Sequence, residues 1–227
     1  MDIFDELKKL GKRPVIAKIG GFRPDESSMS WFGGNFLIEE GLAWPKYNGN
    51  NMLPIIQMCI SEIPGGKEIF GDVELIQVFI NKDKLPLGGM VKNGDGWLLR
   101  AYSRAQDFMI VQTPDDSDKI KPFPIKWYVG EDDDYPCWEE SWKYHNMSVI
   151  NEDDELTERF FEEFNSYLYT KIGGYASYIQ SPCTGDYEYI FQISSEEKPR
   201  FMIGDNGKLY FLKSKADGGW YLHWDCY

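Results

Sequence analysis

Short apolar or alternating runs, separated by Gly, Pro, Asn and Asp, recur along most of this chain. Ile, Val, Phe, Tyr and Trp dominate these runs, which is typical of β-strands bounded by turns. The residues NGDG at 93–96 stand between two such runs and indicate a hairpin turn. The pattern predicts strands at residues 53–60, 75–80, 97–102, 108–112, 188–194, 208–213 and 219–224.

Helical periodicity is confined to two segments. In residues 2–11, Ile3, Leu7 and Leu10 share a face, acids come first and lysines last, so a short helix is expected. Around residues 154–167, apolar side chains recur every four residues after an acidic first turn, which predicts a second helix. Strands and helices do not alternate along the chain. We therefore expect an α+β fold, mainly antiparallel β with few helices, and not a doubly wound nucleotide-binding sheet.

Three features occur in the same order towards both ends of the chain: a double glycine, a glutamine in an apolar run, and a Gly-Asp pair before a strand. They are Gly33-Gly34, Gln57 and Gly71-Asp72 in the first half, and Gly173-Gly174, Gln192 and Gly204-Asp205 in the second. In this alignment Ile76, Val78 and Phe79 correspond to Leu209, Phe211 and Leu212. The pattern indicates a degenerate internal duplication, with chance similarity as the alternative.

The same residues resemble the YwqG-like family of bacterial proteins, whose hallmark is a GG...Q pattern followed by a GD-x-G-x-L-Y-F stretch. The resemblance is carried by Trp44-Pro45, LPIIQ at 53–57, KIGGYASYIQ at 171–180, the strand of Gln192, and GDNGKLYF at 204–211, which includes Gly207. The strand after Gly71-Asp72 departs from the pattern because it lacks the corresponding glycine. The resemblance implies a mainly β or α+β domain of two related halves in a cytoplasmic bacterial protein. It implies no chemistry, and an immunity or antitoxin role is an extrapolation from it.

One domain is expected over residues 1–227, with a first half at about 12–112, an acidic connecting segment at about 113–155, and a second half at about 156–227. A content of 42% hydrophobic and 16% aromatic residues can bury a core, which excludes a disordered chain. Apolar stretches are shorter than the ~20 residues of a membrane span, and we see no export signal. We expect a cytoplasmic protein without membrane contact, and the sequence does not indicate its oligomeric state.

The negative charge of the chain is concentrated in one segment. Of a net charge of -13, residues 107–163 contribute -12, from 17 acids and five bases. Such a surface repels phosphate groups, which argues against a nucleic-acid partner. Within it, EDDD at 131–134 is followed by YPCWEESW, so acids adjoin aromatic residues. We expect a basic protein partner to bind a face made of Asp132, Asp133, Asp134, Trp138 and Trp142. A solvated acidic loop, or core packing of the two tryptophans, is the alternative.

Side chains suited to metal or nucleophilic chemistry are few. The four cysteines have no C-x-x-C spacing, and His145 and His223 are the only histidines. His223 lies in an aromatic strand-like run, where a packing role is expected. The EDDD run lacks the alternating ligands of an EF-hand loop. We therefore assign no catalytic residue, metal ligand or cofactor.

The function expected first is a non-catalytic binding module for this basic partner, and two other functions are alternatives to it. Gln57 and Gln192 could present their amides to a small ligand in a cleft between the halves, although buried glutamines more often bond backbone groups. A hydrolase could use Asp72 and Asp205 as paired carboxylates, although an Asp after Gly at a turn usually bonds local backbone. Small-ligand binding ranks above hydrolysis as the alternative.

Overall fold

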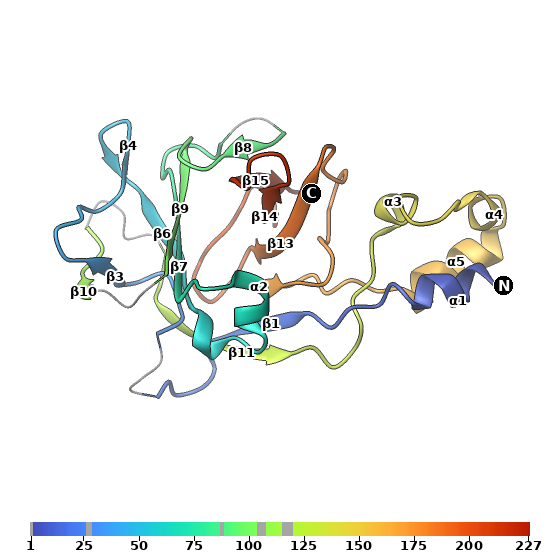
Figure 1. Cartoon of the computed structure of the whole chain (residues 1–227), viewed down its shortest axis with the longest axis horizontal. Helices are drawn as coiled ribbons and strands as arrows, with labels where there is room; N and C mark the ends of the chain where they lie inside the picture. The colour runs from blue at the N-terminus through green and yellow to red at the C-terminus, as the bar shows by residue number, and fades with distance from the viewer. Residues whose placement is uncertain (1, 26–28, 87–88, 104–107, 115–119) are drawn as a thin grey trace.

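Antiparallel strands form a continuous, curled sheet that makes up most of the protein (Figure 1). The computed structural model describes residues 2–25, 29–86, 89–103, 108–114 and 120–227. The sheet strands are β1 Val15–Ile19, β2 Trp31–Phe32, β6 Leu53–Cys59, β7 Leu75–Ile80, β8 Val91–Lys92, β9 Trp97–Tyr102, β11 Phe123–Val129, β12 Lys171–Ile172, β13 Tyr187–Ser194, β14 Lys208–Ser214 and β15 Trp220–Asp225. Their order is β8-β15-β14-β13-β12-β1-β11-β2-β6-β7-β9. Two small sheets pair β3 (Phe36–Glu39) with β10 (Phe108–Val111) and β4 (Lys46–Tyr47) with β5 (Asn50–Asn51).

This architecture confirms the predicted α+β fold, mainly antiparallel β. Each of the seven predicted strands is observed, with ends that differ by at most one residue. The sequence analysis did not predict β1 or β11, in which apolar runs are interrupted by Lys18 and Lys126, two residues that face each other in the ladder. Because β11 lies inside the segment expected to connect the halves, that segment also supplies a central strand of the sheet.

Four short helices gather at one end of the molecule, away from the sheet, and we call them the helical unit (Figure 1). They are α1 Ile3–Lys8, α3 Trp138–Ser141, α4 Ser148–Asn151 and α5 Asp154–Glu163. The 3-10 helix η1 (Ile60–Glu62) and α2 (Gly66–Phe70) instead pack on the sheet core through Ile60 and Phe70. The helical unit has a small core of its own, formed by Phe4, Leu7, Met147, Ile150, Phe160 and Phe164.

Helix α5 begins as its sequence predicts and ends earlier. The carboxylate of Asp153 accepts the N–H of Leu156 at 3.1 Å, and two acids follow in the first turn. The helix ends at Glu163 instead of continuing to residue 167, because Phe164 adopts an extended backbone and buries its ring in the small core. Residues 165–170 are thereby free to run along the second half of the sheet.

The two halves of the chain are interlocked at the middle of the sheet. Strand β1 lies at the start of the first half in sequence but pairs with β12 of the second half. Strand β11 precedes the second half but pairs with β2 of the first half. The two exchanged strands then pair with each other, with Ala17 opposite Trp127. The sheet is therefore continuous from one half to the other.

The first and last strands of the sheet lie next to each other. Strands β8 and β9 stand at opposite ends of the strand order, yet residues 93–96 alone separate them in the chain. These residues form the predicted turn, in which the N–H of Gly94 donates to the carbonyl of Trp97 at 2.9 Å. The side chain of Asn93 also bonds both backbone groups of Leu99, at 2.8 and 2.9 Å. The sheet consequently curls around an enclosed inner face.

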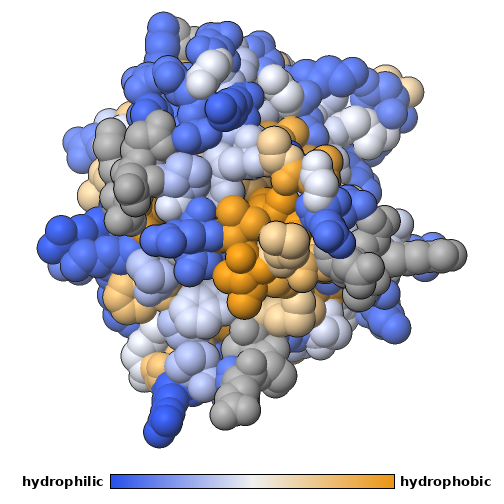
Figure 2. Space-filling model, turned by 90° about the vertical axis from the view of Figure 1, so that its left-hand side faces the viewer, coloured by the Kyte–Doolittle hydropathy of each residue, from blue (hydrophilic) through white to orange (hydrophobic). Residues whose placement is uncertain are grey.

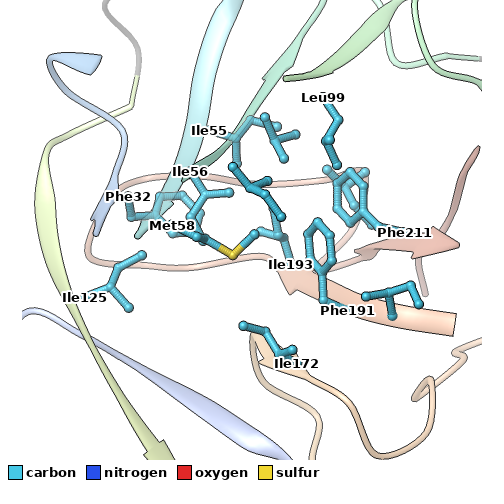
Figure 3. Close-up of a cluster of buried hydrophobic side chains, with 14 of the residues drawn as sticks. Phe32, Ile55, Ile56, Met58, Leu99, Ile125, Ile172, Phe191, Ile193 and Phe211 are labelled. Carbon is cyan, nitrogen blue, oxygen red and sulfur yellow. The ribbon is translucent and has the colours of Figure 1, made fainter. Parts of the chain in front are cut away.

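The main core fills this inner face and is shared by both halves (Figure 3). Phe32 and Met58 come from the first half, and Phe191, Ile193 and Phe211 from the second. The rings of Phe191 and Phe211 stack with centroids 4.3 Å apart. Since both halves bury apolar surface against each other, neither keeps this core when separated from the other.

The opposite end of the molecule from the helical unit carries an apolar surface patch. Figure 2 shows it on the face that lies at the left of Figure 1, where β3 and β10 are found. Met109 and Ile110 of β10 are exposed there. Within the described residues, no helix has the length and apolar character needed to cross a membrane.

Candidate binding site: the acidic segment and an adjoining cavity

Backbone hydrogen bonds hold the acidic run 131–134 in place. Past the ends of β1 and β11, the N–H of Gly130 donates to the carbonyl of Pro14 at 2.8 Å. Lys12 and Asp134 then exchange two backbone hydrogen bonds of 3.1 and 2.8 Å. The run therefore lies beside the segment that precedes β1, with a bend at residues 131 and 132 between these contacts.

The three aspartates of this run have different environments. Asp132 is exposed, and its N–H donates to the hydroxyl of Tyr167 at 2.9 Å. Asp133 is half-buried and forms an ion pair with Nε of Arg13 at 2.8 Å. Asp134 is fully buried. The sequence placed all three on one surface, and this is wrong for Asp134: the chain bends at residues 131 and 132, so Asp134 is buried although Asp132 is exposed.

Asp134 forms a buried ion pair with Lys171 in the second half. Its Oδ2 lies 2.7 Å from Nζ of Lys171, and neither side chain is exposed to solvent. Oδ2 also accepts the N–H of Tyr175 at 2.7 Å, and Oδ1 accepts the N–H of Tyr167 at 2.8 Å. Burial raises the pKa of Asp134 and lowers that of Lys171, while their mutual attraction opposes both shifts. The pair anchors the acidic run to the loop that follows β12.

The glycine pairs of the two halves permit equally close contacts. Gly174 has φ of +67°, and a Cβ on it would coincide with the carboxylate of Asp134. Gly34 has φ of +81°, and a Cβ there would lie 2.6 Å from Pro122. Only glycine takes this conformation without strain and leaves room for the neighbour. Gly174 is thus required both for the turn and for the buried ion pair.

Trp138 and Trp142 divide between the core and the surface. Trp138 is half-buried and packs edge-on to Phe160 with ring centroids 5.0 Å apart. Trp142 is 43% exposed, and its ring lies 6.4 Å from that of Trp138. Phe161, which the sequence analysis missed, is 57% exposed and lies 5.7 Å from Trp138 on another side. We call these three side chains the aromatic patch: two exposed rings supported by a third.

Acidic side chains surround the aromatic patch. Residues 131–163 contain 13 acids and two bases. Glu139, Glu158 and Glu162 are exposed on the same two helices, α3 and α5, as the patch. The single base of α5, Arg159, bonds Glu163 at 2.6 Å and lies over the ring of Phe4. The surface of the helical unit near the patch is therefore strongly negative.

Gln57 and Gln192 are buried and fully engaged with the backbone. Gln57 accepts the N–H of Leu37 at 2.9 Å and donates to the carbonyl of Met29 at 2.7 Å. Gln192 accepts the N–H of Ser177 at 3.0 Å and donates to the carbonyl of Tyr169 at 2.9 Å. Their strands, β6 and β13, are separated in the sheet by β2, β11, β1 and β12. The structure does not bring the two amides together in a cleft.

Further contacts repeat between the halves. Gly33 N–H donates to Ile55 at 2.7 Å, and Gly173 N–H donates to Ile190 at 2.8 Å. Ladder irregularities fall at the same position in both halves, between Pro54 and Ile56 and between Tyr189 and Phe191. These contacts occur at positions that the sequence alignment of the two halves also relates. A further equivalence is absent from the sequence alignment: Trp97 and Trp220 both begin the strand that pairs with β7 or β14.

The Gly-Asp pairs lie in turns. Gly71 and Gly204 have positive φ of 64° and 51°, whereas Asp72 and Asp205 are exposed. Gly207 follows in the second turn, where a Cβ would meet the carbonyl of Asp225. Neither aspartate is among the described residues that line the cavity beside the acidic run. The turns serve to start β7 and β14 rather than to pair two carboxylates.

A cavity of about 860 Å³ lies between the acidic run, the end of α5, residues 165–169 and the start of β14. Its walls include Asp132, Asp133, Tyr135, Tyr167, Tyr169 and Lys208. Its volume is in the range of small-molecule sites. This cavity was not predictable from the sequence because its walls come from six separate segments of the chain.

Lys208 is the buried cation of this cavity. Its Nζ donates to the carbonyl of Ser177 at 2.9 Å. Burial lowers the pKa of Lys208 to about 8; Asp225 acts in the opposite direction, and Lys171 adds to the lowering. Lys208 is therefore protonated at neutral pH and loses its proton in mildly basic solution.

Other reactive side chains lie in structural settings. Nδ1 of His223 lies 2.6 Å from the carbonyl of Gly89, and its ring stacks on Tyr210, so the predicted packing role fits its position. Burial raises the pKa of Cys137 to about 12, which disfavours the reactive thiolate. Among the described residues, no three His, Cys, Asp or Glu side chains are grouped as metal ligands would be.

Residues 30–218 match the model of one protein family, Domain of unknown function (DUF1963). The chain belongs to the DUF1963 family. The matched part contains both glycine pairs, both buried glutamines and the acidic segment, whereas α1 and the central strand β1 precede it. A comparison with curated proteins finds no match. Membership in DUF1963 therefore assigns a family and leaves the activity open.

Proposed function

We propose that this DUF1963 protein is a non-catalytic binding module that contacts a basic protein partner through the helical unit. The observation that carries the proposal is the aromatic patch within the most acidic part of the chain. Trp142 and Phe161 expose about half of their surface, although both adjoin the half-buried Trp138. Exposed aromatic rings on a supporting layer are typical anchors of protein interfaces.

The acidic surroundings give this surface a preferred partner. Carboxylates around an aromatic anchor accelerate the encounter with a basic protein, and they do so less at high salt. The same carboxylates repel the phosphates of nucleic acids. Asp132 and Asp133 add accessible negative charge in the acidic run, while the buried Asp134 acts through the fold alone.

A toxin domain or nuclease with a basic surface would satisfy these requirements, which gives an immunity-like role in the cytoplasm. The segments that carry the YwqG-like resemblance all lie within the residues matched by DUF1963. We infer that the two descriptions refer to one family. Because Gln57 and Gln192 are engaged with the backbone, the small-ligand alternative depends on the cavity instead.

The test is capture of partners from a lysate of the native organism, followed by binding kinetics with the purified partner. A variant carrying Glu158→Lys and Glu162→Lys is compared with a control carrying Glu68→Lys and Glu188→Lys, which are exposed on the sheet side. We expect a basic partner that associates slowly with the first variant and normally with the control. Trp142→Ala should increase the dissociation rate. The proposal would be refuted if the Glu158→Lys, Glu162→Lys variant, the control variant and Trp142→Ala all bound the partner with the kinetics of the wild type.

A further inference from the structure

We propose that the cavity beside the acidic run binds a lysine or arginine side chain of the partner. This inference rests on the proposed function and names a second, separate contact. The charges, aromatic rings and volume of the cavity all favour such a side chain.

Ion pairs within the protein leave one carboxylate of the cavity without a counter-charge. Asp133 is paired with Arg13, whose Nη1 also donates to the carbonyl of Gly130 at 3.1 Å. Glu163 is paired with Lys8 at 3.0 Å and with Arg159. Among the described residues, Asp132 has no cation within ion-pair distance. An incoming ammonium or guanidinium group would supply that charge.

The one remaining cation of the cavity does not compete for Asp132. Lys208 is buried, and its Nζ donates to the carbonyl of Ser177, which lies in the segment between β12 and β13. Its charge is also offset by Asp225, which raises the pKa of Lys208. A cation that enters the cavity therefore meets the negative charge of Asp132, which is exposed and unpaired.

Tyrosine rings form the rest of the wall. Tyr167, Tyr169 and Tyr135 line the cavity, and Tyr169 is 64% exposed. A cation over such a ring is attracted by its π electrons. Because the Tyr167 hydroxyl accepts the N–H of Asp132, one ring is held at a fixed position relative to the free carboxylate. A carboxylate flanked by aromatic rings favours a basic side chain over a neutral or acidic one.

The volume of about 860 Å³ exceeds what one side chain needs, so the flanking peptide groups of the partner fit as well. The probe is therefore a short peptide, acetyl-Gly-Arg-Gly-amide. Its matched control has citrulline in place of arginine, which keeps the shape and removes the charge. Binding is followed by amide chemical shifts of the full-length protein during titration.

We expect the arginine peptide to shift the amides of residues 132, 167 and 169, and the citrulline peptide to bind more weakly. Asp132→Asn should reduce arginine-peptide affinity by about tenfold, as expected for loss of one hydrogen bond to a charged group. Tyr169→Leu should also weaken it, whereas Glu188→Gln, the same charge change on exposed β13, should leave it unaltered.

Equal affinity for the two peptides, or an Asp132→Asn protein that binds arginine as the wild type does, would overturn the cavity inference. The proposed function is judged separately, by Trp142→Ala and the Glu158→Lys, Glu162→Lys variant with the partner protein. A partner that depends on those residues, but not on Asp132, supports the binding module and removes the cavity from its interface.

Discussion

Gln57 and Gln192 make equivalent hydrogen bonds in the two halves of the sheet. Each side-chain oxygen accepts the N–H of the residue three positions after a glycine pair, Leu37 at 2.9 Å and Ser177 at 3.0 Å. Each side-chain nitrogen donates to a carbonyl two positions before the strand that leads into the pair. Both amides therefore close a glycine loop over the outer face of the sheet.

Removing either amide should destabilise the protein. Gln57→Ala and Gln192→Ala each leave an N–H and a carbonyl, in buried or part-buried positions, without this side-chain partner, at a cost of about 1–3 kcal/mol. Chemical denaturation gives the free energy of unfolding. Glu188→Ala, on the exposed side of β13, is the control and should change it by less than about 0.5 kcal/mol. If Gln192→Ala were as stable as this control, the loop-closing role would be wrong.

The sequence predicted the strands well because they depend on local signals. Gly turns and alternating apolar residues mark β6, β7, β13 and β14. The sequence alignment also makes Val78 correspond to Phe211, and the ladders agree: Val78 lies opposite Ile56, just before Gln57, and Phe211 lies opposite Phe191, just before Gln192. The exchange of β1 and β11 was not predictable in the same way. It depends on pairing between segments about 110 residues apart, for which neither strand carries a local signal.

The candidate site was predicted only in outline. The acidic segment and its tryptophans were identified from composition, but composition does not show on which side of the backbone each residue lies. Asp134 is buried because its position in the extended run points inward, towards Lys171. Phe161 was overlooked because it stands beside the core residue Phe160 in the sequence. Phe160 is buried, whereas Phe161 is exposed.

Two adjacent glycines should respond differently to substitution by alanine. Gly173 and Gly174 both have positive φ, of 69° and 67°, so each alanine bears the cost of a left-handed backbone, about 1–2 kcal/mol. Gly173 has no atom within 4 Å of an added Cβ, whereas at Gly174 the Cβ would collide with the carboxylate of Asp134. Gly174→Ala should therefore be clearly the less stable protein in thermal unfolding. Equal melting temperatures would show that the loop moves away from Asp134 freely.

The buried ion pair should behave as a coupled unit. Lys171→Met leaves the carboxylate of Asp134 buried without its cation, and Asp134→Asn leaves the ammonium group of Lys171 without its anion. Each change should cost about 3–5 kcal/mol, the range for removing one partner of a buried pair. The double variant should lose less than the sum of the two, because no unpaired charge remains. A double-mutant cycle of unfolding free energies measures this difference, and strictly additive losses would contradict the coupling.

Lys208 should make the stability of the protein depend on pH in mildly basic solution. Its pKa is lowered to about 8 in the folded protein, chiefly by burial, whereas an unfolded lysine titrates near about 10.4. Between these values the unfolded chain holds a proton that the folded chain has released, so the free energy of unfolding should rise with pH. The rise is at most about 1.4 kcal/mol per pH unit for one proton, and it is lost as pH falls through 8. Lys208→Met should reduce this slope, whereas Lys126→Met, on an exposed position of β11, should retain it. Urea denaturation at several pH values from 7 to 10 measures the slopes, and parallel curves for wild type and Lys208→Met would contradict the assignment.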